Sequence, residues 1–89
     1  MDPSLILIQK VIVSHPLGLH LRVAAALVLL VKKYKSHITL KKGDQRINAR
    51  SILGILGLGA RSGIELEIIA EGEDAKQALL DIENFFNKK

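Results

Sequence analysis

The stretch Ile64-Glu65-Leu66-Glu67-Ile68 decides the fold class, because apolar and charged residues alternate along it without a break. Side chains of a β-strand point alternately to opposite faces of a sheet, so this period of two is typical of a half-exposed strand. One face of the sheet is then solvated, and the other buries the apolar residues against a second layer. The segments on either side of this strand have to supply that layer.

The rest of the chain divides into segments of strand and helix character. Leu5 to Val13 is short and rich in β-branched residues, which predicts a strand. Leu21 to Lys33 lacks Gly and Pro and is rich in Ala and Leu, which predicts a helix with lysines at its carboxyl end. Two more strands are expected at Ser36 to Leu40 and Gln45 to Ala49. A short helix is expected to be capped by Ser51, to run to Leu56 and to be ended by Gly57. A last helix should follow Asp74 as its N-cap, because apolar residues recur there at helical spacing: Ala78, Leu79, Ile82, Phe85 and Phe86.

Turn residues separate these elements and set their order. The expected breaks are Ser14-His15-Pro16-Leu17-Gly18, a hairpin turn at Lys41-Lys42-Gly43-Asp44, a glycine-rich loop from Gly57 to Gly63, and Glu71-Gly72-Glu73-Asp74. The resulting order is βαββαβα. It predicts an α+β sandwich in a single domain over residues 1–89, with a four-stranded antiparallel sheet and three helices packed on one face.

Composition excludes several classes of protein. With 48% hydrophobic and 25% charged residues and only two prolines, the 89-residue chain is neither disordered nor fibrous. It contains no cysteine, which excludes a disulfide scaffold and thiol chemistry and agrees with a cytoplasmic location. The longest apolar stretch, Val23 to Val31, has nine residues, against about 20 needed to span a bilayer. We expect no signal peptide and no membrane insertion.

The net charge of +4 is unevenly distributed along the chain. Residues 1–50 carry nine Lys or Arg and two Asp, whereas residues 51–89 carry four Lys or Arg and seven Asp or Glu. A basic half of a small protein indicates an anionic partner: nucleic acid, a phosphorylated group or an acidic protein face. Segregation of charge on an ordinary soluble surface is the alternative.

The segment Gly18-Leu19-His20-Leu21-Arg22 is the candidate for chemistry. His20 lies where a turn leads into a helix, and unpaired backbone N–H groups there make an anion site at the positive end of the helix dipole. Arg22 adds a cation and several donors to the same place. These features disfavour a protonated ring and leave a neutral, nucleophilic imidazole, whose phosphorylated form the same donors would hold. A histidine that only fills the helix start or the core is the structural alternative.

Four motifs in order carry a family resemblance: Gly18-Leu19-His20-x-Arg22-x-Ala24-Ala25, Asn48-x-x-Ser51-Ile52-Leu53-Gly54, Leu58-Gly59-x-x-x-Gly63 and Ala70-Glu71-Gly72-Glu73-Asp74. The chain resembles the histidine-containing phosphocarrier (HPr) family of the bacterial phosphoenolpyruvate:sugar phosphotransferase system over roughly residues 5–87. The resemblance implies an open-faced β-sandwich. It also implies that His20 accepts a phosphoryl group from Enzyme I and passes it to sugar-specific IIA components, that Arg22 assists at that group, and that the protein is a stoichiometric carrier without enzymatic turnover or cofactor.

Three positions depart from the family pattern. Val23 stands where the family usually has proline, which fixes φ within the first helical turn. Leu21 replaces a usually small residue, and Leu17 replaces a usually polar one. A more apolar rim around His20 bears on the choice of donor and acceptor and on the rate of transfer.

Ser51 and the residues after it form a second candidate site. Ser51 is expected to cap a helix, and the resemblance also implies that it is a site of regulatory phosphorylation by the HPr kinase/phosphorylase. The apolar residues expected to dock partners around His20 are Leu17, Leu21, Ala25, Ile52, Leu53 and Leu56, although at least one of the last three should pack into the core.

Two further functional hypotheses follow. One is a purely regulatory interaction protein, modified at Ser51 and bound to a transcription regulator or a metabolic enzyme, with His20 idle. The other is a nucleic-acid binder, which the scarcity of aromatic residues and the absence of a basic recognition helix argue against.

His15 and His37 do not complete a metal site, because Pro16 and Gly18 prevent His15 and His20 from sharing a helix face. We expect a monomer that binds neither metal nor nucleic acid.

Overall fold

A computed structural model describes residues 5–87 of the chain. Its elements are β1 (Ile6–Ile12), α1 (Leu21–Val31), β2 (His37–Lys42), β3 (Gln45–Asn48), α2 (Ile52–Gly57), β4 (Glu65–Glu71) and α3 (Ala75–Asn87). The predicted order βαββαβα is confirmed, and so is the assignment of each segment to strand or helix.

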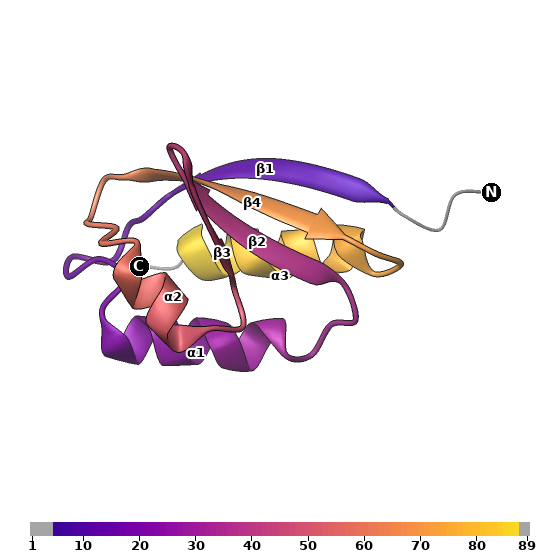
Figure 1. Ribbon diagram of the computed structural model, residues 1–89, viewed down its shortest axis with the longest axis horizontal. Helices are drawn as coiled ribbons and strands as arrows, with labels where there is room; N and C mark the ends of the chain where they lie inside the picture. The colour runs from indigo at the N-terminus through magenta and orange to yellow at the C-terminus, as the bar shows by residue number, and fades with distance from the viewer. Residues whose placement is uncertain (1–4, 88–89) are drawn as a thin grey trace.

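The four strands form one antiparallel sheet in the order β1-β4-β2-β3. The last strand in sequence lies in the middle, where Ile68 pairs with Gln9 of β1 on one side and with Leu40 of β2 on the other. All three helices lie on the same side of this sheet, and the other side is open (Figure 1). The expected α+β fold with helices on one face is therefore confirmed.

The core lies between the sheet and the helices, and it is formed by the apolar residues that recur along both. Alternate residues of the two central strands point toward the helices, and each helix places one stripe against them. The fully buried side chains include Ile38, Leu40, Leu66, Ile68 and Ala70 of the sheet and Ala24, Leu27, Val31, Ile55, Ala78 and Ile82 of the helices.

Two of the predicted strands end two or three residues too early, whereas the strands predicted to end at Val13 and Ala49 end one residue earlier, at Ile12 and Asn48. We expected strands to end at Leu40 and Ile68, but β2 continues to Lys42 and β4 to Glu71. The extra residues are stabilised by ladder pairing, since β4 has a partner strand on each side. The hairpin turn is accordingly confined to Gly43 and Asp44, and Gly43 supplies the positive φ of 57° that a two-residue hairpin of this kind needs.

The helix ends also differ from the prediction. Helix α1 ends at Val31, not at Lys33, and Lys32 is its C-cap. Gly57 does not end the short helix as expected: it is the last residue of α2, and Leu58 is the cap. The N–H groups of Leu58 and Gly59 still donate hydrogen bonds to the carbonyls three residues earlier, so the helical turn continues past Gly57. The residue with left-handed backbone that ends this turn is therefore Gly59, with φ of 61°.

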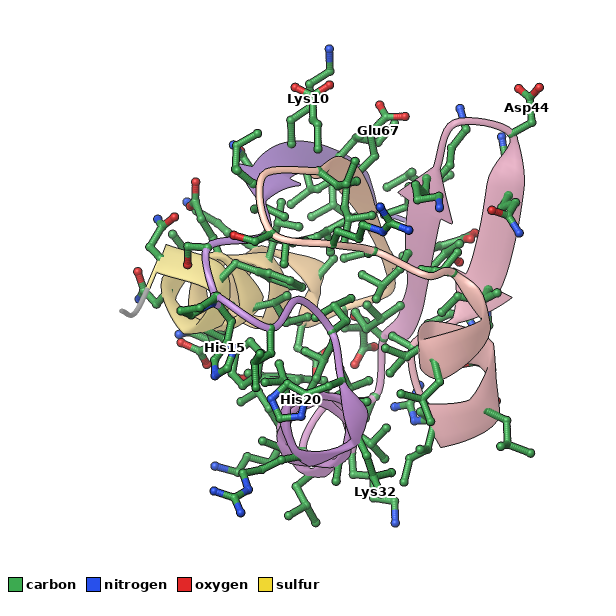
Figure 2. All side chains as sticks on the ribbon, turned by 90° about the vertical axis from the view of Figure 1, so that its left-hand side faces the viewer. Lys10, His15, His20, Lys32, Asp44 and Glu67 are labelled. Atoms are coloured by element: carbon green, nitrogen blue, oxygen red, sulfur yellow. The ribbon has the colours of Figure 1, made fainter. Side chains whose placement is uncertain are left out.

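The open face of the sheet is solvated as expected, yet it is not wholly polar. Lys41 of β2 and Glu67 of β4 form a salt bridge of 3.4 Å across it, and Lys10 and Glu67 point away from the helices in Figure 2. The edge strand β1, however, exposes three isoleucines on this face, Ile6, Ile8 and Ile12. Within residues 5–87, no helix is both long enough and apolar enough to cross a membrane.

Candidate functional site

His20 is the N-cap residue of α1. Its backbone is extended, with φ of −79° and ψ of 177°, and its side chain makes no capping hydrogen bond. Its carbonyl accepts the first bond of the helix, from the N–H of Ala24 at 2.8 Å. The N–H groups of the first turn therefore lack a side-chain cap at the positive end of the helix dipole, where an anion is stabilised.

The segment before His20 is fixed against the loop that precedes β4. Gly18 has φ of 71°, and a Cβ there would lie 2.5 Å from the carbonyl oxygen of Ala60. The N–H of Leu19 donates to that same oxygen at 2.9 Å, and the N–H of Gly63 donates to Val13 at 2.7 Å. Backbone contacts on both sides of the turn thus set the position of the histidine.

The two ring nitrogens of His20 have different surroundings. Nε2 is buried and has no hydrogen-bond partner among the described residues. The residue as a whole is only partly buried, and it lines a hollow at the surface. A reacting molecule cannot approach the ring through Nε2.

Arg22 and His20 line one surface hollow, as the sequence predicts. This hollow has a volume of about 480 Å³ and is bounded by His15, Leu17, His20, Leu21 and Arg22. Arg22 lies on the exposed side of the first turn of α1. Its guanidinium group and the N–H groups of that turn can therefore serve the same bound anion.

The structure brings a second histidine to this hollow, which sequence reasoning missed. The ring centroids of His15 and His20 lie 4.9 Å apart, with an angle of 54° between the ring planes. Figure 2 shows the two labelled rings next to each other at the start of α1. The turn residues Pro16 and Gly18 could have predicted this proximity, because they fold the chain back between the two histidines.

A second, mainly apolar hollow lies beside the first. It has a volume of about 330 Å³ and is lined by Val13, Ser14, His15, Leu19, Arg22, Val23, Ala26, Phe85 and Phe86. The start of α1 and the end of α3 lie at the same end of the molecule (Figure 1), and the hydroxyl of Ser14 donates to the carbonyl of Phe86. Val23, one of the three departures from the family pattern, is thus half-buried between the two helices.

Ser51 is the N-cap of α2, as predicted. Its Oγ accepts a hydrogen bond from the N–H of Gly54 at 2.9 Å, and the residue is exposed. The hydroxyl is thus a structural cap on an exposed residue.

The six residues predicted to dock partners divide into two groups. Leu17, Leu21 and Leu53 are 73%, 62% and 81% exposed. Ala25, Ile52 and Leu56 are partly buried, and Ile55, which was not among the six, supplies the buried side chain of α2. Helices α1 and α2 pack side by side (Figure 1), so Leu21 and Leu53 belong to neighbouring elements.

The remaining histidine, His37, is exposed on β2 and does not line either hollow. Between residues 5 and 87, no three His, Asp or Glu side chains gather in an arrangement that could hold a metal ion.

The structure is thus a one-sided α+β sandwich with a histidine and an arginine at an uncapped helix N-terminus, a place where an anionic group is stabilised. The family described as "PTS HPr component phosphorylation site" matches residues 8–88. The chain belongs to this family, the HPr phosphocarriers of the phosphotransferase system.

Individual relatives agree with this assignment. The chain is 38% identical over 82 residues to the phosphocarrier protein HPr of Treponema pallidum, covering 92% of this chain and 93% of that protein. It is 39% identical over 71 residues to the HPr-like protein Crh of Bacillus subtilis, covering 80% and 84% of the two chains. The crystal structure of HPr from Bacillus anthracis superposes with a TM-score of 0.88 at 32% identity, covering 91% and 96%.

Proposed function

We propose that this protein accepts a phosphoryl group on Nδ1 of His20 from Enzyme I, with phosphoenolpyruvate as the source, and passes it to sugar-specific IIA components. The observation that carries the proposal is the position of His20 at the uncapped N-terminus of α1, in one hollow with Arg22. Membership of the HPr family supports the same role.

Nδ1 is the proposed nucleophile because Nε2 is closed off from solvent. In the neutral ring, one nitrogen carries the proton and the other has a free lone pair. Nε2 keeps its proton while the lone pair of Nδ1 forms the bond to phosphorus. The bond between phosphorus and the donor atom breaks, and its electron pair returns to the donor.

The surroundings of His20 stabilise the charge of the transferred group. The guanidinium of Arg22 provides charge-assisted hydrogen bonds to its oxygens. The first-turn N–H groups of α1 provide fixed dipoles that need no reorganisation during transfer. The bond between nitrogen and phosphorus remains reactive, so the same site releases the group to an acceptor.

Partner docking is proposed for the apolar surface formed by Leu17, Leu21 and Leu53. Its residues come from the turn before α1, from α1 and from α2, and they are the most exposed apolar side chains near the hollow. An apolar centre of this kind suits transient complexes, and the basic character of residues 1–50 would raise the rate of encounter with an acidic partner.

The test is incubation with phosphoenolpyruvate and Enzyme I, followed by intact mass. The wild type and Ser51→Ala should gain one acid-labile, base-stable phosphate, and His20→Ala should gain none. Arg22→Ala should fold normally and accept the group more slowly, because it loses the charge-assisted bonds. Folded wild-type protein that gains no phosphate with Enzyme I of its own host would exclude the carrier role, and an unchanged rate in Arg22→Ala would remove Arg22 from the mechanism.

A regulatory role through phosphorylation of Ser51 is the second proposal. It is supported by the exposure of the hydroxyl at the start of α2 and by the similarity to the HPr-like protein Crh. A phosphate there would add nearly two negative charges at a helix N-terminus, where they are tolerated, beside the apolar docking surface. Without transfer through His20, the protein would act only as a regulated binding partner.

A further inference from the structure

His15 lies in the same hollow as the proposed phosphoryl acceptor, His20, although it is five positions earlier in the chain and outside the helix. It belongs to the turn between β1 and α1, and its ring is exposed. The ring lies 4.9 Å from that of His20 between centroids, and both rings line the hollow that contains Arg22 (Figure 2). A group attached to His20 in this hollow would therefore have His15 within hydrogen-bonding range.

Two backbone N–H groups hold His15, one through its ring and one through its carbonyl. The N–H of Leu17 donates to Nδ1 of His15 at 3.2 Å, and the N–H of Gly18 donates to the His15 carbonyl at 2.9 Å. Since Nδ1 accepts a hydrogen bond, its lone pair is occupied and the proton of the neutral ring resides on Nε2. The nitrogen left for other contacts is thus a hydrogen-bond donor.

We infer that His15 is a second phosphoryl-binding residue, whose Nε2–H donates a hydrogen bond to an oxygen of the phosphoryl group on His20. The inference rests on the proposed function of His20. A phosphoryl group presents three acceptor oxygens, and Arg22 and the amides of the first helical turn approach them from α1. His15 adds a donor from the preceding turn, so the group is held from two elements.

The bonding pattern of His15 suggests two variants that separate its local and its phosphoryl-binding roles. In His15→Asn, the amide oxygen can accept the bond from Leu17, because an Asn side chain bonded to the N–H two residues on is an Asx turn. This variant keeps the turn but lacks a donor that extends as far as Nε2. In His15→Gln, the longer side chain places an amide N–H near the position of Nε2, so it should restore the donor.

The experiment measures the equilibrium constant for phosphoryl transfer from purified phosphorylated Enzyme I to each variant, by intact mass. We expect His15→Asn to lower this constant about tenfold, as the loss of one charge-assisted hydrogen bond predicts, and His15→Gln to recover most of it. Urea unfolding of the unphosphorylated proteins should show similar midpoints for the wild type and His15→Asn, because the turn is preserved.

The outcomes distinguish the inference from the proposed function. A wild type that accepts no phosphate contradicts the role of His20 itself. If the wild type accepts phosphate and His15→Asn has the same equilibrium constant, His15 does not bind the group. A loss in His15→Asn that His15→Gln does not reverse also overturns the inference, because the effect would then not depend on the donor.

Discussion

At the scale of single residues, Gly18 is the position near the site where a larger side chain is least tolerated. Its φ of 71° lies in the left-handed region, and its Cα faces the carbonyl of Ala60 so closely that a side chain has no room. The backbone N–H of Leu19 donates a hydrogen bond to that carbonyl, and His20 is the next residue. Only Leu19 separates Gly18 from His20, so a displacement of the backbone at Gly18 should also move the histidine.

Replacing Gly18 by alanine should destabilise the protein by about 2–4 kcal/mol, since it combines a positive φ with a steric clash. The matched control is Gly43→Ala in the β2–β3 turn, where φ is 57° but nothing lies within 4 Å of an added Cβ. There we expect a loss of only about 1 kcal/mol, from the backbone conformation alone. Urea unfolding would measure both, and equal losses would show that the contact with Ala60 is unimportant. Gly18→Ala should also accept phosphate more slowly than Gly43→Ala.

At the scale of elements, α2 is a six-residue helix that depends on its surroundings. A helix of this length is not stable alone in water, so its cap and its buried side chain decide whether it forms. Ser51 supplies the cap and Ile55 the side chain, which is fully buried. Ile55 is fully buried and Ile52 and Leu56 pack partly against the core, so Leu53 is left 81% exposed on the outer side of the helix.

Substitutions at Ser51 should separate its capping role from a regulatory one. Ser51→Ala loses the bond from Gly54 and should cost about 1 kcal/mol in urea unfolding. Ser51→Asp keeps an acceptor and should retain near wild-type stability while adding a negative charge. If that charge regulates docking, Ser51→Asp should accept phosphate from Enzyme I more slowly than Ser51→Ala. Equal rates in the two variants would leave Ser51 as a structural cap.

At the scale of the whole molecule, polar contacts join distant segments near the end of α1 and the start of α3, at the opposite end of the molecule from the start of α1 (Figure 1). The hydroxyl of Tyr34, just after α1, donates to Asp81 of α3. The carboxylate of Asp74, directly before α3, accepts bonds from the N–H groups of Lys35 and Ser36 at 2.9 Å and from the Ser36 hydroxyl. The guanidinium of Arg50 donates to the carbonyls of Tyr34 and Ser36. The connection between α1 and β2 is thereby anchored to the start of α3 and to the end of β3.

Tyr34 gives these contacts a measurable pH dependence. Burial, together with the hydrogen bond to Asp81 and the negative charges of Asp81 and Asp74, raises the pKa of Tyr34 from 10.0 to about 12. Because the neutral form is favoured in the folded state, the stabilisation is complete below pH 10.0 and is lost as the pH rises toward about 12. The chain has one tyrosine and no tryptophan, so phenolate absorbance reports this residue alone. We expect a midpoint near 12 in the folded protein, whereas a midpoint near 10 would contradict the burial; Tyr34→Phe is the control and should show no such transition.

Much of the fold could be predicted because its signals are local. The alternation at Ile64 to Ile68 specified a one-sided sheet, and the Ala- and Leu-rich segment after His20 specified a helix. The candidate pair His20 and Arg22 was predictable for the same reason, since the N-cap and the first turn of one helix are only two positions apart in the chain. Ser51 was recognisable as a cap because the bond it makes, to Gly54, spans only three residues.

The rest depended on contacts between segments that are far apart in the chain. Strand β4 extends to Glu71 because two neighbouring strands pair with it, and Gly57 stays helical because the left-handed turn falls at Gly59. Short-range periodicity and turn chemistry in the sequence specified the kinds of elements and their order, and the family motif around Gly18 to Arg22 pointed to His20 as the candidate reactive residue. The burial of Nε2 of His20 and the position of His15 beside that ring could not be read from local signals, because solvent access and ring proximity depend on how the turn packs against the loop at Ala60.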